Sequence, residues 1–113
     1  MREKIHSYIG FAKRSRELVS GFTGCVSNME KGKICLLIIA SDTAESSLEK
    51  LTRAAEKHQT PYRIYLTQDR LSEMAGEKGR GVFGFTNKSL AGAILQEIDQ
   101  DGQNALGQDG LNV

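Results

Sequence analysis

One segment in the N-terminal third combines a glycine, two hydroxyl side chains and several basic residues, a set that suits binding of phosphate and nucleobases. Gly21 lies where a helix is predicted to begin, and the free backbone N–H groups of a helix N-terminus favour phosphate. Thr23 and Ser27 are four residues apart and therefore share a face of that helix. Basic residues precede and follow the segment: Lys13, Arg14, Arg16, Lys31 and Lys33. The pattern is equally compatible with two interpretations: a nucleic-acid partner, or a capped surface helix whose lysines are solvated.

A second candidate, from Gly79 to Gly84, spells the GxGxxG pattern of dinucleotide-binding loops. In that motif the glycines follow a strand and open a helix. Here they follow a predicted helix and lead into a predicted strand, so the context contradicts a dinucleotide site. The segment is therefore interpreted as a flexible loop entering a strand, and no cofactor is expected.

The remaining reactive side chains are not grouped in a way that predicts catalysis or metal binding. His6 and His58 have no Cys, Asp or Glu at metal-ligand spacing, so no metal site is expected. Cys25 and Cys35 do not form a CxxC pair, and both are expected to be reduced, with Cys35 a small buried apolar residue. No nucleophile is grouped with a base, and no two carboxylates are paired. The sequence therefore predicts a protein that is not an enzyme.

Length and charge are those of one small domain with a basic body. The chain has 113 residues, 39% hydrophobic and 26% charged, as in ordinary globular proteins. The net charge is +1, but the region from Glu97 onward holds four acids and no Lys or Arg. The preceding residues carry 15 bases and 10 acids, a net charge of +5 that is compatible with a nucleic-acid partner. The longest apolar run is far shorter than the roughly 20 residues of a membrane span, and no signal-peptide core follows the charged start, so a cytoplasmic protein is expected.

Helical and extended patterns alternate along the chain and predict an α/β protein with helices on both faces of a mixed sheet. The nearly continuous apolar run from Lys33 to Ala40 predicts a central strand covered on both faces. Residues 1–100 are expected to form the domain, and residues 101–113 a disordered acidic tail. Helices are expected up to Ser15, over 22–31, after 43, after 67–69 and after 87, and strands at 18–19, 33–40, 62–66 and 82–85.

Side-chain patterns within these helices predict their caps and their buried faces. Asp42 or Thr43 is expected to cap the third helix, Thr67 or Asp69 the fourth, and Asn87 the last. In the helix over 22–31 three apolar residues share a face and are expected to point to the core: Phe22, Val26 and Met29.

Four segments follow one another with the order and spacing of a known family: Ile9 to Arg14, Leu18 to Gly21, Lys31 to Asp42 and Leu71 to Gly76. Together they resemble the kink-turn RNA-binding ribosomal proteins of the L-seven-Ae and L-thirty-e superfamily, and most closely its small bacterial YlxQ-like branch. The resemblance runs from about residue 5 to residue 98. It implies a three-layer α-β-α sandwich with a four-stranded mixed sheet, and binding of RNA in which a sharp bend is flanked by tandem G·A pairs.

The central motif of that family, Gly-x-Asn-Glu-x-x-Lys at a helix start, falls on residues 21–27. The glycine is present as Gly21, whereas Thr23, Gly24 and Ser27 stand where the family has Asn, Glu and Lys. A specific hydrogen-bonded pair between a side chain and a base edge typically supplies about 1–3 kcal/mol of discrimination, and these substitutions remove such pairs. General, salt-sensitive RNA binding is therefore better supported than kink-turn specificity.

The resemblance also implies further RNA contacts outside the motif. Asp42 and Lys31 match an acidic and a basic position at the RNA site. The loop before the last strand is expected to rest against the RNA bend, although Glu77, Lys78 and Gly79 cannot pack on an unstacked base as apolar side chains do. The positive charge facing RNA is expected from Lys13, Arg14, Arg16, Lys31, Lys78 and Arg80.

The sequence as a whole predicts a non-enzymatic RNA-binding protein associated with ribosomal, kink-turn-like or other structured RNA, without DNA specificity or a membrane partner. The main alternative is a protein-interaction module on the same fold that has lost RNA binding. The missing Asn, Glu and Lys of the motif favour this alternative, and the basic body opposes it. A small-molecule site would require a concave pocket with converging polar groups, which the sequence does not indicate. The oligomeric state is not predicted.

Overall fold

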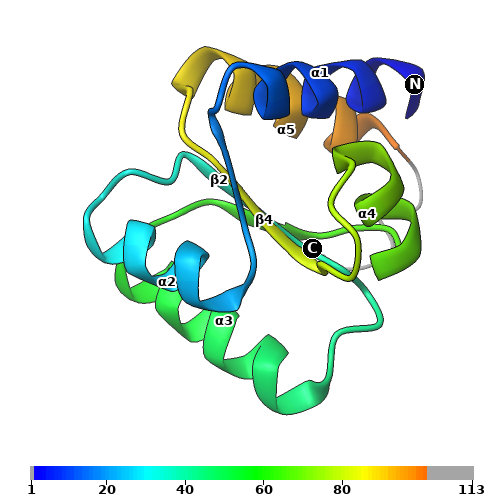
Figure 1. Cartoon of the computed structure of the whole chain (residues 1–113). Helices are drawn as coiled ribbons and strands as arrows, with labels where there is room; N and C mark the ends of the chain where they lie inside the picture. Colours follow the sequence, from blue (N-terminus) through cyan, green and yellow to red (C-terminus); the bar gives the residue numbers. More distant parts are fainter. Residues whose placement is uncertain (1, 102–113) are drawn as a thin grey trace.

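The computed structural model describes residues 2–101, which form a three-layer α-β-α sandwich (Figure 1). Met1 and residues 102–113 lie outside the described part, and with them nearly all of the tail that the sequence predicted to be disordered. The predicted fold class is confirmed. The elements, in chain order, are α1 (Arg2–Arg14), β1 (Leu18–Ser20), α2 (Phe22–Glu30), β2 (Leu36–Ile39), α3 (Glu45–Lys57), β3 (Tyr62–Ile64), α4 (Gln68–Ala75), β4 (Val82–Phe85) and α5 (Lys88–Gln100).

The four strands form one mixed sheet in the order β1-β4-β2-β3. β2 is parallel to β3 and antiparallel to β4, and β4 is antiparallel to β1. Leu37, for example, is paired with Tyr62 on one side and with Gly84 on the other. The run from Lys33 to Ala40 therefore does supply a central strand, although the strand itself begins at Leu36.

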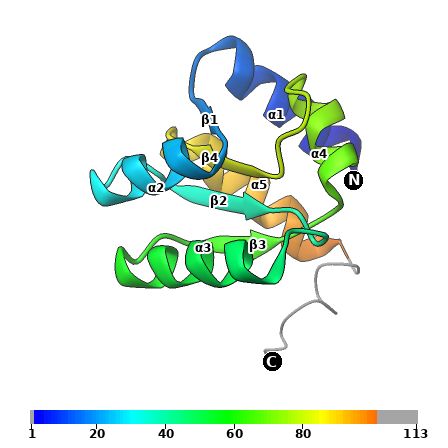
Figure 2. The ribbon, with the colours of Figure 1, turned by 60° about the horizontal axis from the view of Figure 1, so that its bottom comes forward.

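Alternate residues of β2 face opposite helix layers, which explains why its apolar run is continuous. Leu36 and Ile38 belong to the core that α1, α4 and α5 cover. Leu37 and Ile39 belong to the core that α2 and α3 cover. All four side chains are fully buried. Figure 2, turned so that the α2–α3 layer comes forward, shows α5 on the other side of the sheet.

Two of the predicted helix caps are confirmed. At the start of α4, the Oγ1 atom of Thr67 accepts a hydrogen bond from the backbone N–H of Arg70. At the start of α5, the Oδ1 atom of Asn87 accepts one from the N–H of Leu90 at 2.9 Å. In both cases the capping side chain satisfies one of the N–H groups that lack a partner within the helix.

The predicted cap of α3 is wrong, because neither Asp42 nor Thr43 caps this helix. The capping position is occupied by Ala44, and α3 begins without a side-chain cap. The carboxylate of Asp42 instead accepts the backbone N–H of Gln68 at 2.9 Å. Asp42 lies two residues before the capping position, so its side chain connects the β2–α3 turn to the start of α4.

The buried face of α2 also differs from the predicted one. Cys25 and Met29 are fully buried, whereas Phe22 is 39% exposed and Val26 is half-buried. Met29 keeps helical spacing both with Cys25 and with Val26, so periodicity alone does not decide which of these two residues is buried. The small apolar Cys25 takes the core position, and the ring of Phe22 is left at the surface.

The two cysteines have environments that the sequence did not predict. Cys25 is the buried one, and burial raises the pKa of its thiol to about 12. Cys35, expected to be buried, is only partly covered, and its Sγ atom donates to the carbonyl oxygen of Thr86 at 3.6 Å. Cys35 therefore packs against the core at its edge and is not buried in it, as the sequence had predicted it to be.

Candidate nucleic-acid interface

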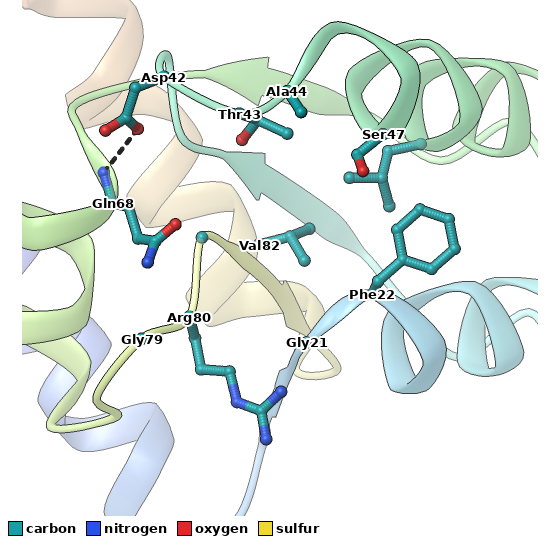
Figure 3. Close-up of a pocket in the computed structure, with 12 residues that line it drawn as sticks. Gly21, Phe22, Asp42, Thr43, Ala44, Ser47, Gln68, Gly79, Arg80 and Val82 are labelled. Carbon is teal, nitrogen blue, oxygen red and sulfur yellow. Dashed lines mark hydrogen bonds between the residues drawn. The ribbon is translucent and has the colours of Figure 1, made fainter.

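A cleft of about 250 Å³ opens at one edge of the sheet, where four segments meet (Figure 3). β1, β2 and β3 all end at this edge, and the antiparallel β4 begins there. In open α/β sheets this is the edge at which ligands commonly bind. The cleft is lined by residues of the α2 start (Gly21, Phe22), the β2–α3 turn (Asp42, Thr43, Ala44), α3 (Ser47, Leu51), the α4 start (Gln68) and the loop into β4 (Gly79, Arg80, Gly81, Val82).

Gly21 brings a helix start and a guanidinium group close together. Its φ of +95° and ψ of 158° belong to a region that only glycine adopts readily. Its N–H donates to the carbonyl oxygen of Val82 at 3.0 Å, which attaches the start of α2 to β4. A Cβ atom placed on Gly21 would lie 2.9 Å from Nη1 of Arg80. The absence of a side chain at Gly21 therefore lets the arginine lie against the helix start, as Figure 3 shows.

The two helices α2 and α3 both begin at the cleft, and both begin without a side-chain cap. Uncapped N–H groups and the helix dipole give a helix start a partial positive charge. Arg80 adds a full positive charge beside the α2 start. The acid in the cleft, Asp42, already accepts the N–H of Gln68. This arrangement favours an anionic ligand such as a phosphate group.

The loop that carries Arg80 is fixed by a side chain of α4. The hydroxyl of Ser72 donates to the carbonyl oxygen of Arg80 at 2.7 Å and accepts the N–H of the same residue at 3.1 Å. Arg80 itself is exposed. Its backbone is therefore held in one position while its charged group remains available to a ligand.

Lys13 holds the other end of the same loop. Its ammonium group donates to the carbonyl oxygens of Ala75 and Gly76, at 3.4 and 3.3 Å, at the end of α4. It also forms an ion pair with Glu77. The hydrogen bond from Lys13 holds the pKa of Glu77 below its ordinary value. Lys13 thus has partners within the protein, and its charge is shared with a carboxylate.

The structure brings together some of the residues that the sequence singled out, and leaves others apart. Gly21, Asp42, Gly79 and Arg80 line the cleft. The next residues of α2 lie beside it, with Thr23 exposed and with Gly24 and Ser27 half-buried. Lys31 is the capping residue at the opposite end of α2.

The basic residues at the end of α1 lie outside the cleft. Arg14 folds back along its own helix, since a Cβ atom on Gly10 would lie 3.3 Å from its Nη1 atom. Arg16 follows α1 in the turn before β1, with a φ of +62°. Lys78 is exposed and lines a shallow groove of α4 that also contains Asp69 and Glu73.

Several cleft residues were not predicted from the sequence. Phe22 was assigned to the core, and nothing in the sequence marks Ser47 or Gln68 as neighbours of Gly21. These residues meet only because β4 lies between β1 and β2 in the sheet. Nothing in the local pattern of α2 marks Phe22 as exposed, because it keeps helical spacing with both Cys25 and Met29.

Among residues 2–101, no three His, Cys, Asp or Glu side chains are placed to share a metal ion. None of the helices in this range has the length and apolar character needed to cross a membrane. The groups that the cleft itself offers to a ligand are hydroxyl, amide, carboxylate and guanidinium groups.

Comparison with known proteins relates the chain to proteins of this fold. Residues 3–92 match the model of the ribosomal protein L7Ae/L30e/S12e/Gadd45 family. The protein described as RNA-binding protein YlxQ of Bacillus subtilis (strain 168) is 22% identical over 91 residues, which cover 80% of this chain and 91% of that protein. The structure of a protein with unknown function from Bacillus halodurans C superposes with a TM-score of 0.81 at 26% identity, covering 85% of this chain and 97% of that one.

Proposed function

Because this chain belongs to the ribosomal protein L7Ae/L30e/S12e/Gadd45 family, we propose that it binds structured RNA and catalyses no reaction. The observation that carries the proposal is the cleft, where two uncapped helix starts and Arg80 converge. A relative of similar length is described as an RNA-binding protein, which agrees with this choice of ligand. We further propose that the target is ribosomal or kink-turn-like RNA and that the protein acts in the cytoplasm.

The electrostatics of the cleft support binding of the RNA backbone. A phosphate group placed between the start of α2 and the guanidinium of Arg80 would receive backbone N–H donors and a charge-assisted hydrogen bond. Phosphate contacts of this kind position an RNA without identifying its sequence. They also release counterions, so the affinity should fall as the salt concentration rises.

The shape of the cleft supports binding of an unpaired nucleotide. A volume of about 250 Å³ is enough to admit part of a nucleotide, and the cleft is open to solvent at its mouth. Thr43, Ser47 and Gln68 offer hydroxyl and amide groups that can pair with the edge of a base. The apolar Val82 and Ala44 line the same space. A base displaced from a bent RNA helix fits this mixture of polar and apolar groups.

Recognition of tandem G·A pairs is expected to be weak. Thr23 offers one hydroxyl in place of an amide, and Gly24 offers only its backbone. A Cβ atom on Gly24 would lie 3.1 Å from Cγ1 of Val19, so a larger residue there requires a small shift of the Val19 side chain. The close approach of α2 to Val19 is compatible with the small residue at a position where the family has Glu.

A titration with two labelled RNAs tests this function. One RNA contains a kink-turn, and in the other the G·A pairs are replaced by Watson–Crick pairs. We expect binding to both, with an affinity that falls steeply with salt and with only a small preference for the kink-turn. Absence of binding to either RNA at low salt would refute the proposal and favour a protein-interaction module.

Arg80 provides the matched variant for this experiment. Arg80→Gln should weaken binding about tenfold and reduce the slope of affinity against salt by about one counterion. Arg53 provides the control, because it is an exposed arginine on α3 that pairs only weakly with Glu49 at 3.2 Å and is not among the cleft residues. Arg53→Gln should bind both RNAs nearly as the unchanged protein does.

A further inference from the structure

We propose that Phe22 is a stacking platform for the unpaired base that the cleft takes up. This inference rests on the proposed function and identifies the side chain that holds the face of the base. It assigns a role in recognition to a residue whose side chain faces the ligand space.

The exposure of Phe22 is the first observation. Among the described residues 2–101, only two large hydrophobic side chains are exposed, Phe11 at 50% and Phe22 at 39%. The rings of Tyr65, Phe83 and Phe85 are buried, and those of Tyr8 and Tyr62 are half-buried. The inner face of α2 is already supplied by Cys25 and Met29, so the fold does not require an aromatic ring at position 22.

The place of Phe22 is the second observation. Its side chain lines the cleft, and Figure 3 shows the ring directed toward Ser47 at the α3 wall. Phe22 follows Gly21 directly, so the ring and the guanidinium of Arg80 flank the same helix start. A nucleotide could place its phosphate at the helix start and its base against the ring at the same time.

The chemistry of the surrounding groups is the third observation. Aromatic side chains bind unstacked bases by stacking on their faces, and this contact tolerates every base because each has a π-face. The hydroxyls of Thr43 and Ser47 and the amide of Gln68 lie in the same cleft and can bond to a base edge. A base between these groups and the ring would bury the exposed face of Phe22.

The inference predicts a specific dependence on the base. An RNA hairpin with one unpaired nucleotide between two stems should bind about tenfold more tightly than the same hairpin with an abasic site at that position. Purines should bind somewhat better than pyrimidines because they stack over a larger area. The difference between the base-containing and abasic hairpins should disappear in Phe22→Leu, which keeps an apolar side chain at the start of α2 and so preserves the packing there.

Two further variants complete the test. Phe11→Leu changes the other exposed phenylalanine, which lies on α1 outside the cleft, and should keep the full preference for the base. Phe22→Trp should also keep it. Because the chain contains no tryptophan, Phe22→Trp introduces a single tryptophan at the cleft, whose fluorescence can be excited separately from that of the three tyrosines. Its fluorescence should be quenched by the hairpin with the unpaired base and much less by the abasic hairpin.

The outcomes separate this inference from the proposed function. If the unchanged protein binds both hairpins equally, or if Phe22→Leu keeps the preference, RNA binding stands and the stacking role of Phe22 is refuted. If neither hairpin binds at low salt, both proposals fail. Loss of the preference in Phe22→Leu, its retention in Phe11→Leu and base-dependent quenching in Phe22→Trp together would establish the stacking contact.

Discussion

Replacing Gly21 by alanine should weaken both the fold and RNA binding, for two different physical reasons. At a φ of +95° and a ψ of 158°, a residue with a Cβ atom is strained by about 1–3 kcal/mol. The added Cβ atom would also lie 2.9 Å from Nη1 of Arg80. The tip of a long side chain can move away at little cost, so backbone strain should account for the loss of stability. Movement of the guanidinium away from the helix start should account for the loss of affinity.

Gly32→Ala is a matched control for this change. Gly32 also has a positive φ, +71°, but it follows the opposite end of α2, and a Cβ atom there would meet nothing within 4 Å. We expect Gly21→Ala to lower the free energy of unfolding by about 2 kcal/mol and to raise the Kd for RNA about tenfold. Gly32→Ala should lose about 1 kcal/mol of stability and bind RNA as the unchanged protein does.

Urea denaturation measures the stability of both variants, and an RNA titration at a temperature where both are folded measures their affinity. The account of the helix start is refuted if Gly21→Ala binds RNA as tightly as the unchanged protein. It is refuted equally if Gly32→Ala weakens binding to the same extent, because the effect would then follow from instability of α2 as a whole.

Three further predictions concern the loop, the thiols and the sheet. The lowered pKa of Glu77 means that its pairing with Lys13 stabilises the fold above the ordinary carboxyl pKa of 4.5, and that this contribution is lost as the pH falls through the lowered value. Between pH 6 and pH 3 the urea midpoint of Glu77→Gln should therefore fall less than that of the unchanged protein. The same pH profile in both proteins would contradict the pairing. Cys25, which is buried and has a pKa raised to about 12, should react with a thiol reagent at pH 8 only after unfolding, whereas the partly covered Cys35 should react in the native protein. The Cys35→Ser variant keeps only Cys25, so rapid modification of this variant in its native state would contradict the assignment. In Gly84→Ala the new Cβ atom would lie 2.6 Å from Cδ1 of Ile34, so the free energy of unfolding should fall by about 1–3 kcal/mol. Adding Ile34→Val, which removes that Cδ1 atom, should recover part of this loss. If the effects of the two substitutions on the free energy of unfolding simply add, the contact is not responsible.

The parts of the fold that the sequence predicted are those governed by local patterns. The apolar run before Ala40 predicted a central strand because both faces of β2 are covered, and Thr67 and Asn87 predicted two caps because capping is a contact between near neighbours. The start of α2 at Gly21 was predicted for the same reason. Each of these features depends on residues that are close together in the chain.

The features that the sequence did not predict depend on contacts between distant segments. Lys13 was assigned to an RNA contact, but its partner Glu77 lies 64 positions away, and only the packing of α1 against α4 brings them together. Asp42 bonds to Gln68 across the sheet edge and so does not cap α3. Phe22 has the helical spacing of a buried residue with Cys25 and Met29, so its exposure depends on where the start of α2 lies on the folded protein and not on the local pattern.

The most direct test of the proposed RNA site is a map of backbone amide chemical shifts in the ¹⁵N-labelled protein as a hairpin with one unpaired nucleotide is added. The proposal predicts that the largest changes follow the cleft, at residues 21–24, 43–47 and 79–82, with little change in α5 or at the C-terminal end of α3. Changes concentrated on α5 or β3 would place the interface elsewhere and contradict the proposed site. Absence of any change at low salt would contradict RNA binding itself.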